Sequence, residues 1–282
     1  MMKHLALVWL VILSCLQSGA AESVLFRKKS AFNTVLVTQE GACRILKFQT
    51  PTGFVEESRC EVGRPWYLTH GYLQLELLGL TMAPKLDDLL VVGLGGGALS
   101  NQLARALPKA RVDSLELDPV VVEAAQKFFG YLQDKLRHAY VGDARAHLEH
   151  SRQLYDVIFL DAFDGLEIPD TLRTRQFYQL VHAHLKPQGV AVTNLHQRSA
   201  LYASDRNTLA AVFQHCYAFQ GTAQAVVVCQ DGEARAPDWI VERALHLRQH
   251  LALPYPLEKL ARTLLPNSGW DQAAPILEDL KN

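Results

Sequence analysis

The sequence lacks an excess of charge of either sign. Its 282 residues include 28 Lys and Arg against 29 Asp and Glu, which gives a formal net charge of −1. Nucleic-acid-binding proteins usually carry a basic surplus to meet the phosphates, so the composition predicts no nucleic-acid partner. With 49% hydrophobic and 20% charged residues, the chain is neither disordered nor collagen-like. Its length suits one large domain, or one domain with a small appendage.

Recognisable metal-binding and triad patterns are scarce as well. His147, His150, His182 and His184 are expected on helices, and their spacing is not that of a zinc site, so no metal is expected. No Ser-His-Asp or Cys-His arrangement can be assembled from neighbouring residues, and the chain contains no internal repeat or low-complexity segment. Candidate chemistry therefore has to come from other residue types.

An apolar run at the N-terminus predicts export. Lys3 and His4 precede the run 5–15, and small residues follow at 18–21, which is typical of a secretory signal peptide. The run is shorter than the roughly 20 residues that span a bilayer, and no later transmembrane span is expected. We therefore expect residues 1–21 to be a signal peptide and the mature protein to be periplasmic or secreted. Lipidation at Cys15, within a loose lipoprotein box, and an uncleaved anchor are the alternatives.

Four cysteines remain beyond this segment, an even number in an oxidising compartment: Cys43, Cys60, Cys216 and Cys229. The first two flank a Thr-Pro-Thr-Gly turn, and counting outward from a pairing of Gln49 with Phe54 places them opposite each other. The other two flank a Gly-containing turn. Opposed residues of an antiparallel pair lie close enough for a disulfide, so we expect both pairs to be bridged. Four buried free thiols are the alternative.

The pattern of elements predicts an α/β protein in three parts after the signal peptide. Residues 22–62 are strand-like and are expected to form a small N-terminal β domain. In residues 63–235 strands and helices alternate, which predicts a Rossmann-like doubly wound sheet of the class I S-adenosylmethionine-dependent methyltransferase type. Residues 236–282 are expected to be a helical C-terminal tail. Strands are expected at 89–92, 112–117, 139–141, 157–160 and 190–194.

A glycine-rich motif follows the first strand of that sheet. In GLGGGA, Gly93, Gly95 and Gly97 precede Ala98, where a helix is expected to begin. Such glycines permit a tight turn and a close approach of the backbone to a ligand, and the helix N-terminus offers free N–H groups. The same spacing occurs in NAD enzymes and in nucleoside-binding proteins, so the motif alone does not separate them.

Acidic residues after the next two strands favour a nucleoside. Glu116 ends the second strand, where a carboxylate can accept both ribose hydroxyls. Asp143 follows the third strand and can accept from an adenine amino group, while Ala144 donates its backbone N–H. Together with the glycines, these residues favour an S-adenosyl sulfonium compound over a dinucleotide. The alternatives are that Glu116 caps a helix and that Asp143 is a turn residue.

Two further carboxylates follow the fourth strand. Asp161 and Asp164 are expected at the carboxyl edge of the sheet, facing the ligand crevice. Two acids there would attract a cationic amine, and one could accept a proton as the amine attacks the carbon beside the sulfonium. An Asx turn closing the strand is the alternative.

Several stretches in series resemble one family. They are VLFRKKSAFNTVLV, GYLQLELLG, GLGGGA, LELDPVVVEAAQKFFG, VGDA, YDVIFLDAFDG and RQFYQLVHAHLKPQGV. Across residues 24–229 the chain resembles the polyamine aminopropyltransferases, the spermidine synthases, and especially their shorter bacterial spermidine synthase-like relatives. The resemblance implies a transferase of polyamine biosynthesis that moves an aminopropyl group from decarboxylated S-adenosylmethionine to a di- or polyamine. It also implies a homodimer.

The resemblance assigns roles to residues as well. Glu116 would hold the ribose, Asp143 and Ala144 the adenine, and Asp161 would be the proton acceptor. Asp164 would bind the amine, and Tyr72 and Gln74 would line its pocket.

The chain departs from the family pattern at three places. The family's Gln just before the first strand falls near Ala21 and has no equivalent here. The acid that follows the family's glycine triplet is Ala98 here, and the family's Asp-Ser-Ser-Asp-Pro is Asp-Ala-Phe-Asp-Gly at 161–165. Methyl transfer from S-adenosylmethionine and an exported, non-catalytic binding protein therefore remain as alternatives.

Overall fold

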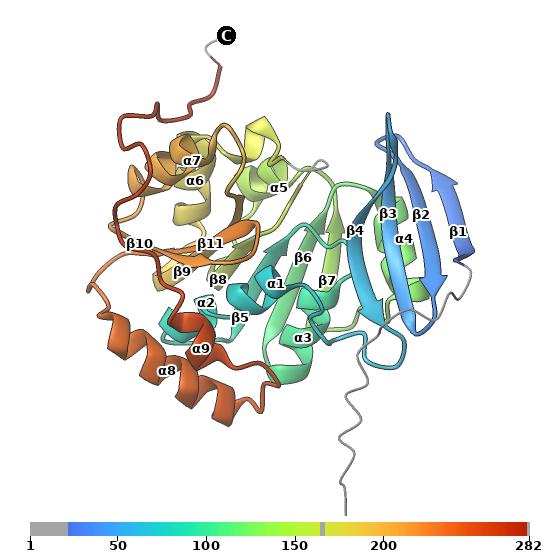
Figure 1. The fold of residues 1–282 in the computed structure, drawn as a ribbon, viewed down its shortest axis with the longest axis horizontal. Coiled ribbons are helices and arrows are strands. Elements are labelled where there is room, and N and C mark those ends of the chain that lie inside the picture. The colour runs from blue at the N-terminus through green and yellow to red at the C-terminus, as the bar shows by residue number, and fades with distance from the viewer. Residues whose placement is uncertain (1–21, 164–166, 281–282) are drawn as a thin grey trace, which may run out of the picture.

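The computed structural model describes residues 22–163 and 167–280 (Figure 1). The expected signal peptide and Asp164 therefore lie outside the described residues. A small antiparallel sheet opens the chain, with its strands in sequence order, and confirms the N-terminal β domain. Its strands are β1 (Ser23–Lys29), β2 (Thr34–Glu40), β3 (Cys43–Thr50) and β4 (Gly53–Glu61).

The central sheet has seven strands in the order β10-β11-β9-β8-β5-β6-β7. The strands are β5 (Asp88–Val92), β6 (Arg111–Glu116), β7 (Arg137–Val141), β8 (Tyr155–Leu160), β9 (Leu185–His196), β10 (His215–Gln220) and β11 (Gln224–Gln230). The five from β7 to β9 are parallel, whereas β11 is antiparallel to both of its neighbours. The sheet winds outward from β5 in both directions, which confirms the doubly wound fold.

Helices cover both faces of this sheet (Figure 1). One face packs against α1 (Gly71–Glu76), α2 (Gly79–Met82), α3 (Ala98–Ala106), α8 (Pro237–His250) and α9 (Leu257–Ala261). The other packs against α5 (Ala144–His150), α6 (Arg175–Ala183) and α7 (Tyr202–Ala210). No described helix is long and apolar enough to cross a membrane.

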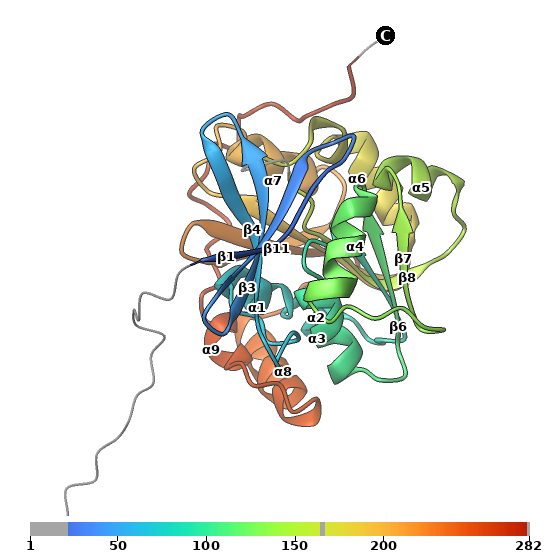
Figure 2. The same ribbon diagram turned by 90° about the vertical axis from the view of Figure 1, so that its right-hand side faces the viewer.

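Helix α4 (Pro119–Phe128) joins the two sheets (Figure 2). Its Val120, Val121 and Ala124 pack against Val35 and Leu46 of the N-terminal sheet. Asp118 caps this helix by accepting from the Val120 N–H at 2.8 Å, and Pro119 follows at the first helical position. The N-terminal sheet is thereby held beside the carboxyl ends of the central strands.

The prediction of a Cys43–Cys60 disulfide is wrong, because a β-bulge separates the two residues. Gln49 does pair with Phe54, as predicted, but the register slips farther out: Lys47 faces Glu56 while Leu46 faces Ser58. The extra residue on β4 moves every later pairing by one, so that Cys43 faces Glu61 and Cys60 faces Arg44. A slip by one residue also turns side chains to opposite faces of the sheet. Both cysteines are free, and burial raises the pKa of the Cys60 thiol to about 11.

The expected Cys216–Cys229 disulfide is confirmed. The two residues are directly opposed in the β10–β11 pair, which has no bulge, and their Cα atoms lie 4.1 Å apart. The same counting argument thus succeeds in the regular hairpin and fails in the bulged one.

The C-terminal tail is helical only in its first part. After α8 and α9, residues 262–280 contain no further described helix and run across the outside of the protein. Arg206 stacks on Trp270, and Arg145 forms an ion pair with Asp279. Specific side-chain contacts, rather than helix formation, therefore hold this segment in place.

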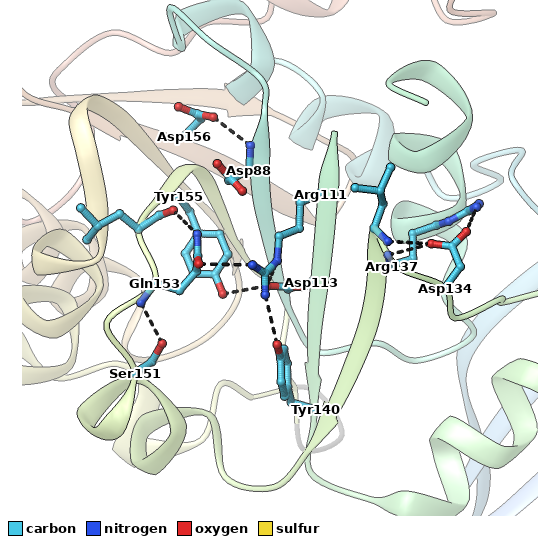
Figure 3. Close-up of polar contacts among 12 residues, drawn as sticks. Asp88, Arg111, Asp113, Asp134, Arg137, Tyr140, Ser151, Gln153, Tyr155 and Asp156 are labelled. Atoms are coloured by element: carbon cyan, nitrogen blue, oxygen red, sulfur yellow. Dashed lines mark hydrogen bonds and ion pairs between the residues drawn. The ribbon is translucent and has the colours of Figure 1, made fainter. Parts of the chain in front are cut away.

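Polar contacts line the amino-terminal edge of the central sheet (Figure 3). Lys186 contacts Asp88 at 2.5 Å and Asp156 at 3.0 Å. Arg111 lies 2.9 Å from Asp113, which also accepts from the Tyr155 hydroxyl at 3.1 Å. The acids at this edge are thus neutralised by cations of the same protein.

Candidate active site

A cavity of about 670 Å³ lies at the carboxyl ends of β5, β6, β7 and β8. Its walls come from the glycine-rich loop after β5, from the acidic residues that follow the next strands, and from β4 of the N-terminal sheet. In an open α/β sheet, ligands bind at this edge. The cavity is therefore the candidate active site.

The three glycines of GLGGGA have different tasks. Gly93 has a φ of +93°, and a Cβ atom there would collide with the backbone carbonyl of Asp161. Gly95 lines the cavity directly, whereas Gly97 is the N-cap residue of α3 and packs against Tyr131. The first glycine thus lets the candidate base approach β5, and the second leaves room for a ligand.

Glu116 is held at the end of β6 by backbone donors. Its carboxylate accepts from the N–H groups of Leu94 at 3.1 Å, Gly95 at 3.4 Å and Asp118 at 3.0 Å. Burial raises the pKa of Glu116, although these hydrogen bonds act in the opposite direction. Glu116 lines the cavity beside the glycine loop, where the sequence predicts a ribose site.

Asp143 and Ala144 line the neighbouring part of the cavity. Asp143 also caps α5, because its carboxylate accepts from the Ala146 N–H at 2.8 Å. Asp143 is thus a helix N-cap and not the turn residue considered as its alternative. Capping is compatible with ligand binding, since a carboxylate has several acceptor positions.

Asp161 follows β8 and is anchored on both sides. Its N–H donates to the Val92 carbonyl at 2.9 Å, and its carboxylate accepts from Asn194 Nδ2 at 3.1 Å and from the Tyr72 hydroxyl. Burial raises the pKa of Asp161, while the two hydrogen bonds and the nearby His70 lower it. A carboxylate with a raised pKa is a stronger base at neutral pH, as proton abstraction requires.

The structure separates Tyr72 from Gln74. Tyr72 lines the cavity from α1 and contacts Asp161. Residues two apart on a helix point in different directions, and Gln74 donates instead to the Leu68 carbonyl at 2.8 Å, outside the cavity lining. The role expected for Gln74 therefore has no support from its position.

The lining residues that were not anticipated from the sequence include Glu56, Glu57, His70 and Asn194. The β4 bulge places three consecutive residues, 56–58, against the cavity, whereas a regular strand would point every second one away. Burial acts to raise the pKa of Glu56, but hydrogen bonds from His70 and Arg59 lower it to about 2. Only the adjacent pair of glutamates in the sequence could have hinted at this wall.

The lining is strongly acidic. Its carboxylates are Glu56, Glu57, Glu116, Asp118, Asp143 and Asp161. Among the described residues that line the cavity there is no Lys or Arg. A concave site with charge of one sign concentrates ligands of the opposite sign. The cavity therefore suits a ligand with positive charges.

Glu76 lies behind this lining, at the end of α1 and one turn after Tyr72. Its side chain is fully buried, and neither carboxyl oxygen has a hydrogen-bond partner among the described residues. Burial and the charge of Asp161 both raise its pKa well above the ordinary range. Within the described parts of the chain, no cluster of His, Cys, Asp or Glu could hold a metal ion.

Residues 74–225 match the spermine/spermidine synthase domain, which is more than half of the chain. The chain belongs to the spermine/spermidine synthase family. It is 29% identical over 276 residues to a polyamine aminopropyltransferase of Vibrio vulnificus, covering 91% of this chain and 89% of that relative. The family resemblance expected from the sequence is thereby confirmed, as is the expected enzyme class, a transferase.

Solved structures of two kinds resemble this family member. A probable spermidine synthase from Corynebacterium glutamicum has a TM-score of 0.72 at 18% identity, covering 91% of this chain and 97% of that one. Human Methyltransferase-like protein 13 in complex with SAH has a TM-score of 0.61 at 26% identity, covering 72% and 96%. The human eEF1A lysine and N-terminal methyltransferase is 32% identical over 212 residues, which span 68% of this chain and 28% of that protein.

Proposed function

We propose that this member of the spermine/spermidine synthase family transfers an aminopropyl group from decarboxylated S-adenosylmethionine to a di- or polyamine. The observation that carries the proposal is the acidic cavity lining, which has no Lys or Arg among its described residues. Decarboxylated S-adenosylmethionine and a polyamine carry only positive charges. The carboxylate of ordinary S-adenosylmethionine would meet no cationic lysine or arginine there.

The nucleoside half of the site has the donors and acceptors that an adenosine group needs. Glu116, Asp143 and Ala144 all line the cavity. Glu116 accepts hydrogen bonds from the ribose hydroxyls, the Asp143 carboxylate accepts one from the adenine amino group, and the Ala144 N–H donates one to the adenine ring. Gly95 leaves space for the ligand, since among the described residues beyond its chain neighbours only Ser58 comes within 4 Å of the position of its missing Cβ. The predicted nucleoside residues therefore fit the group as a set.

The transfer step is carried by Asp161. The sulfonium supplies an electrophilic carbon and a thioether leaving group. The neutral amine nitrogen forms a bond to that carbon, the carbon–sulfur bond breaks, and one amine proton passes to the Asp161 carboxylate. Tyr72 and Asn194 hold the carboxylate in place from two sides. The amine-binding role of Asp164 stays a prediction, as it lies outside the described residues.

Methyl transfer from S-adenosylmethionine to an amine is the second candidate. It is favoured by the match to the eEF1A methyltransferase, and by the similarity to a structure that binds SAH in an equivalent fold. The same nucleoside residues and the same base would serve either reaction, because both begin with an amine attacking a carbon beside a sulfonium.

Calorimetric titration separates these candidates. The protein is titrated with decarboxylated S-adenosylmethionine, S-adenosylmethionine and methylthioadenosine, and is then assayed with 1,4-diaminobutane. We expect binding of the decarboxylated compound and of methylthioadenosine, followed by formation of a longer polyamine. Tight binding of the carboxylated compound alone would favour methyl transfer. If none of the three compounds binds, the result would favour a non-catalytic binding protein that kept the fold.

We also propose that the chain is exported, to the periplasm or beyond the cell, after cleavage following Ala20 or Ala21. The Cys216–Cys229 disulfide supports this proposal, because disulfides persist mainly in oxidising compartments. Intact mass and thiol titration of the protein purified from its native host test it. Cleavage leaves two free thiols, on Cys43 and Cys60. A lipid-modified mass would indicate processing at Cys15 instead.

A further inference from the structure

Asn194 has a hydrogen-bonding capacity that the described residues do not use. It lies on β9, its side chain is 2% exposed, and it lines the cavity. Its Nδ2 donates to Asp161 Oδ1 at 3.1 Å, whereas its own Oδ1 is buried without a partner among the described residues. One end of this amide is therefore engaged with the base, and the other end has no hydrogen-bond partner among the described residues.

The orientation of the amide follows from the charge beside it. Turning the group over would bring its carbonyl oxygen against the Asp161 carboxylate, where two acceptors would repel each other. The oxygen is therefore held as an acceptor beside the base. Burying a carbonyl oxygen without a hydrogen bond is costly, so native proteins rarely leave one unsatisfied unless a ligand or a water completes it.

We propose that Asn194 is a second amine-binding residue, whose Oδ1 accepts one N–H of the attacking amine while Asp161 accepts the other. The inference rests on the proposed transfer to an amine and extends it to the class of acceptor. Two acceptors side by side match a primary amine, which has two N–H groups and a lone pair. A secondary amine has one N–H and leaves Asn194 unsatisfied.

The arrangement also directs the reaction. With both N–H groups engaged by the protein, the lone pair of the nitrogen is the part left to face the electrophilic carbon. As the nitrogen–carbon bond forms and the carbon–sulfur bond breaks, the proton on the Asp161 side moves to the carboxylate. The proton held by Asn194 stays on the product, which is a secondary amine. Such a product is therefore a poorer acceptor at this site than the primary amine.

The test compares Asn194→Ala with the wild type on two acceptors, 1,4-diaminobutane and N,N′-dimethyl-1,4-diaminobutane. We expect the wild type to prefer the primary diamine by about tenfold or more in kcat/KM, a typical loss when a buried polar group goes unpaired. Asn194→Ala should lower kcat/KM for the primary diamine by a similar factor and reduce the preference to about twofold or less. A variant that keeps the wild-type preference overturns the inference.

The pH profile provides a second readout. The Asn194 hydrogen bond lowers the pKa of Asp161, and Tyr72, His70 and Glu76 are the other groups that act on this carboxylate or its neighbours. Removing the amide should therefore shift the acidic limb of kcat/KM to higher pH by about half a unit to one unit. If neither the acidic limb of the pH profile nor the preference for the primary diamine changes, Asn194 has only a structural role and the inference is wrong.

A matched control is Asn101→Ala. Asn101 lies on α3 outside the cavity lining, and its Nδ2 donates to the Phe129 carbonyl at 3.1 Å. It should leave the preference between the two diamines unchanged. A methylthioadenosine affinity equal to that of the wild type verifies that each variant is folded. If Asn194→Ala does not fold, Asn194→Ser takes its place in the test.

Failure of the proposed function is distinguishable in the same experiment. If the wild type forms no product from any amine, transfer itself is refuted. The Asn194 inference is then judged by calorimetric binding of the two diamines in the presence of methylthioadenosine. Equal affinities of the wild type and Asn194→Ala for the primary diamine would overturn it.

Discussion

The two edges of the central sheet use acidic residues in opposite ways. At the amino-terminal edge, Lys186 pairs with Asp88 and Asp156. Arg111 pairs with Asp113 at the same edge (Figure 3). At the carboxyl edge, Glu116 and Asp161 are half-buried and line the cavity. Within the described parts of the chain, neither they nor Asp143 lies within ion-pair distance of a Lys or Arg. Carboxylates thus form ion pairs within the protein at one edge and remain available to bind a cationic ligand at the other.

This contrast shows how one fold can place stabilising and functional carboxylates at opposite edges of a sheet. A buried carboxylate with a cationic partner and hydrogen bonds is largely compensated, and removing a partner is what destabilises the protein. A buried carboxylate without a cation keeps a raised pKa, as burial produces for Glu116 and Asp161. Such uncompensated groups in a cavity are typical of functional sites.

The largest expected effect is that of Asp161→Asn at the carboxyl edge. Because the amide cannot accept the amine proton, kcat for transfer should fall by about 10²–10⁴-fold, while methylthioadenosine affinity stays near the wild-type value. Steady-state assays and calorimetry measure the two quantities. The matched variant at the other edge, Asp88→Asn, should keep its turnover. Full activity of Asp161→Asn would remove this residue from its role as base.

A smaller effect on binding is expected for Glu116→Gln. The ribose hydroxyls lose a charged acceptor, and hydrogen bonds to charged groups contribute about 1.5–3 kcal/mol, so methylthioadenosine affinity should fall by roughly 10- to 100-fold. Calorimetric titration measures it. Asp134→Asn, at an exposed ion pair with Arg137, serves as the control and should bind normally. Unchanged affinity of the Gln variant would place the ribose elsewhere.

Asp113→Asn at the amino-terminal edge should affect stability instead of activity. Its carboxylate is 1% exposed and is held by Arg111 and the Tyr155 hydroxyl. Replacing the charge should lower the free energy of unfolding by about 1–3 kcal/mol, as for other hydrogen bonds to charged groups. Denaturant unfolding measures this loss, and turnover should stay at the wild-type level. A variant that is equally stable but inactive would reverse the comparison between the edges.

The smallest effect, and the one with a characteristic pH dependence, is expected for Glu76→Gln. The folded state raises the pKa of Glu76, so above about pH 4.3 it retains a proton that the unfolded chain releases. Wild-type stability therefore falls as pH rises toward the raised pKa. The glutamine lacks this loss and should be more stable than the wild type near pH 8, by about 1–2 kcal/mol, but not at pH 4. Thermal melting at both pH values tests it, and a difference independent of pH would contradict it.

Much of the site could be predicted because it depends on local order along the chain. GLGGGA, Glu116, Asp143 and Asp161 each follow a strand of a parallel sheet, and parallel strands end at the same edge. The residues that were missed reach the cavity by other routes. Asn194 sits inside β9 rather than after it, and Glu56 and Glu57 come from another sheet. Gln74 was expected to line the cavity with Tyr72, but both lie on the short helix α1, where residues two apart point in different directions.

The alternation of strands and helices, the glycine loop and the acids that follow each strand can all be obtained from the sequence. They depend on periodicity and on residues close together in the chain. Which acids are neutralised, and whether opposed cysteines pair, depends on the folded protein. One extra residue in β4 separates Cys43 from Cys60 and turns two glutamates toward the cavity. Strand register and the desolvation of a carboxylate both depend on contacts between distant segments, so neither can be obtained from local sequence.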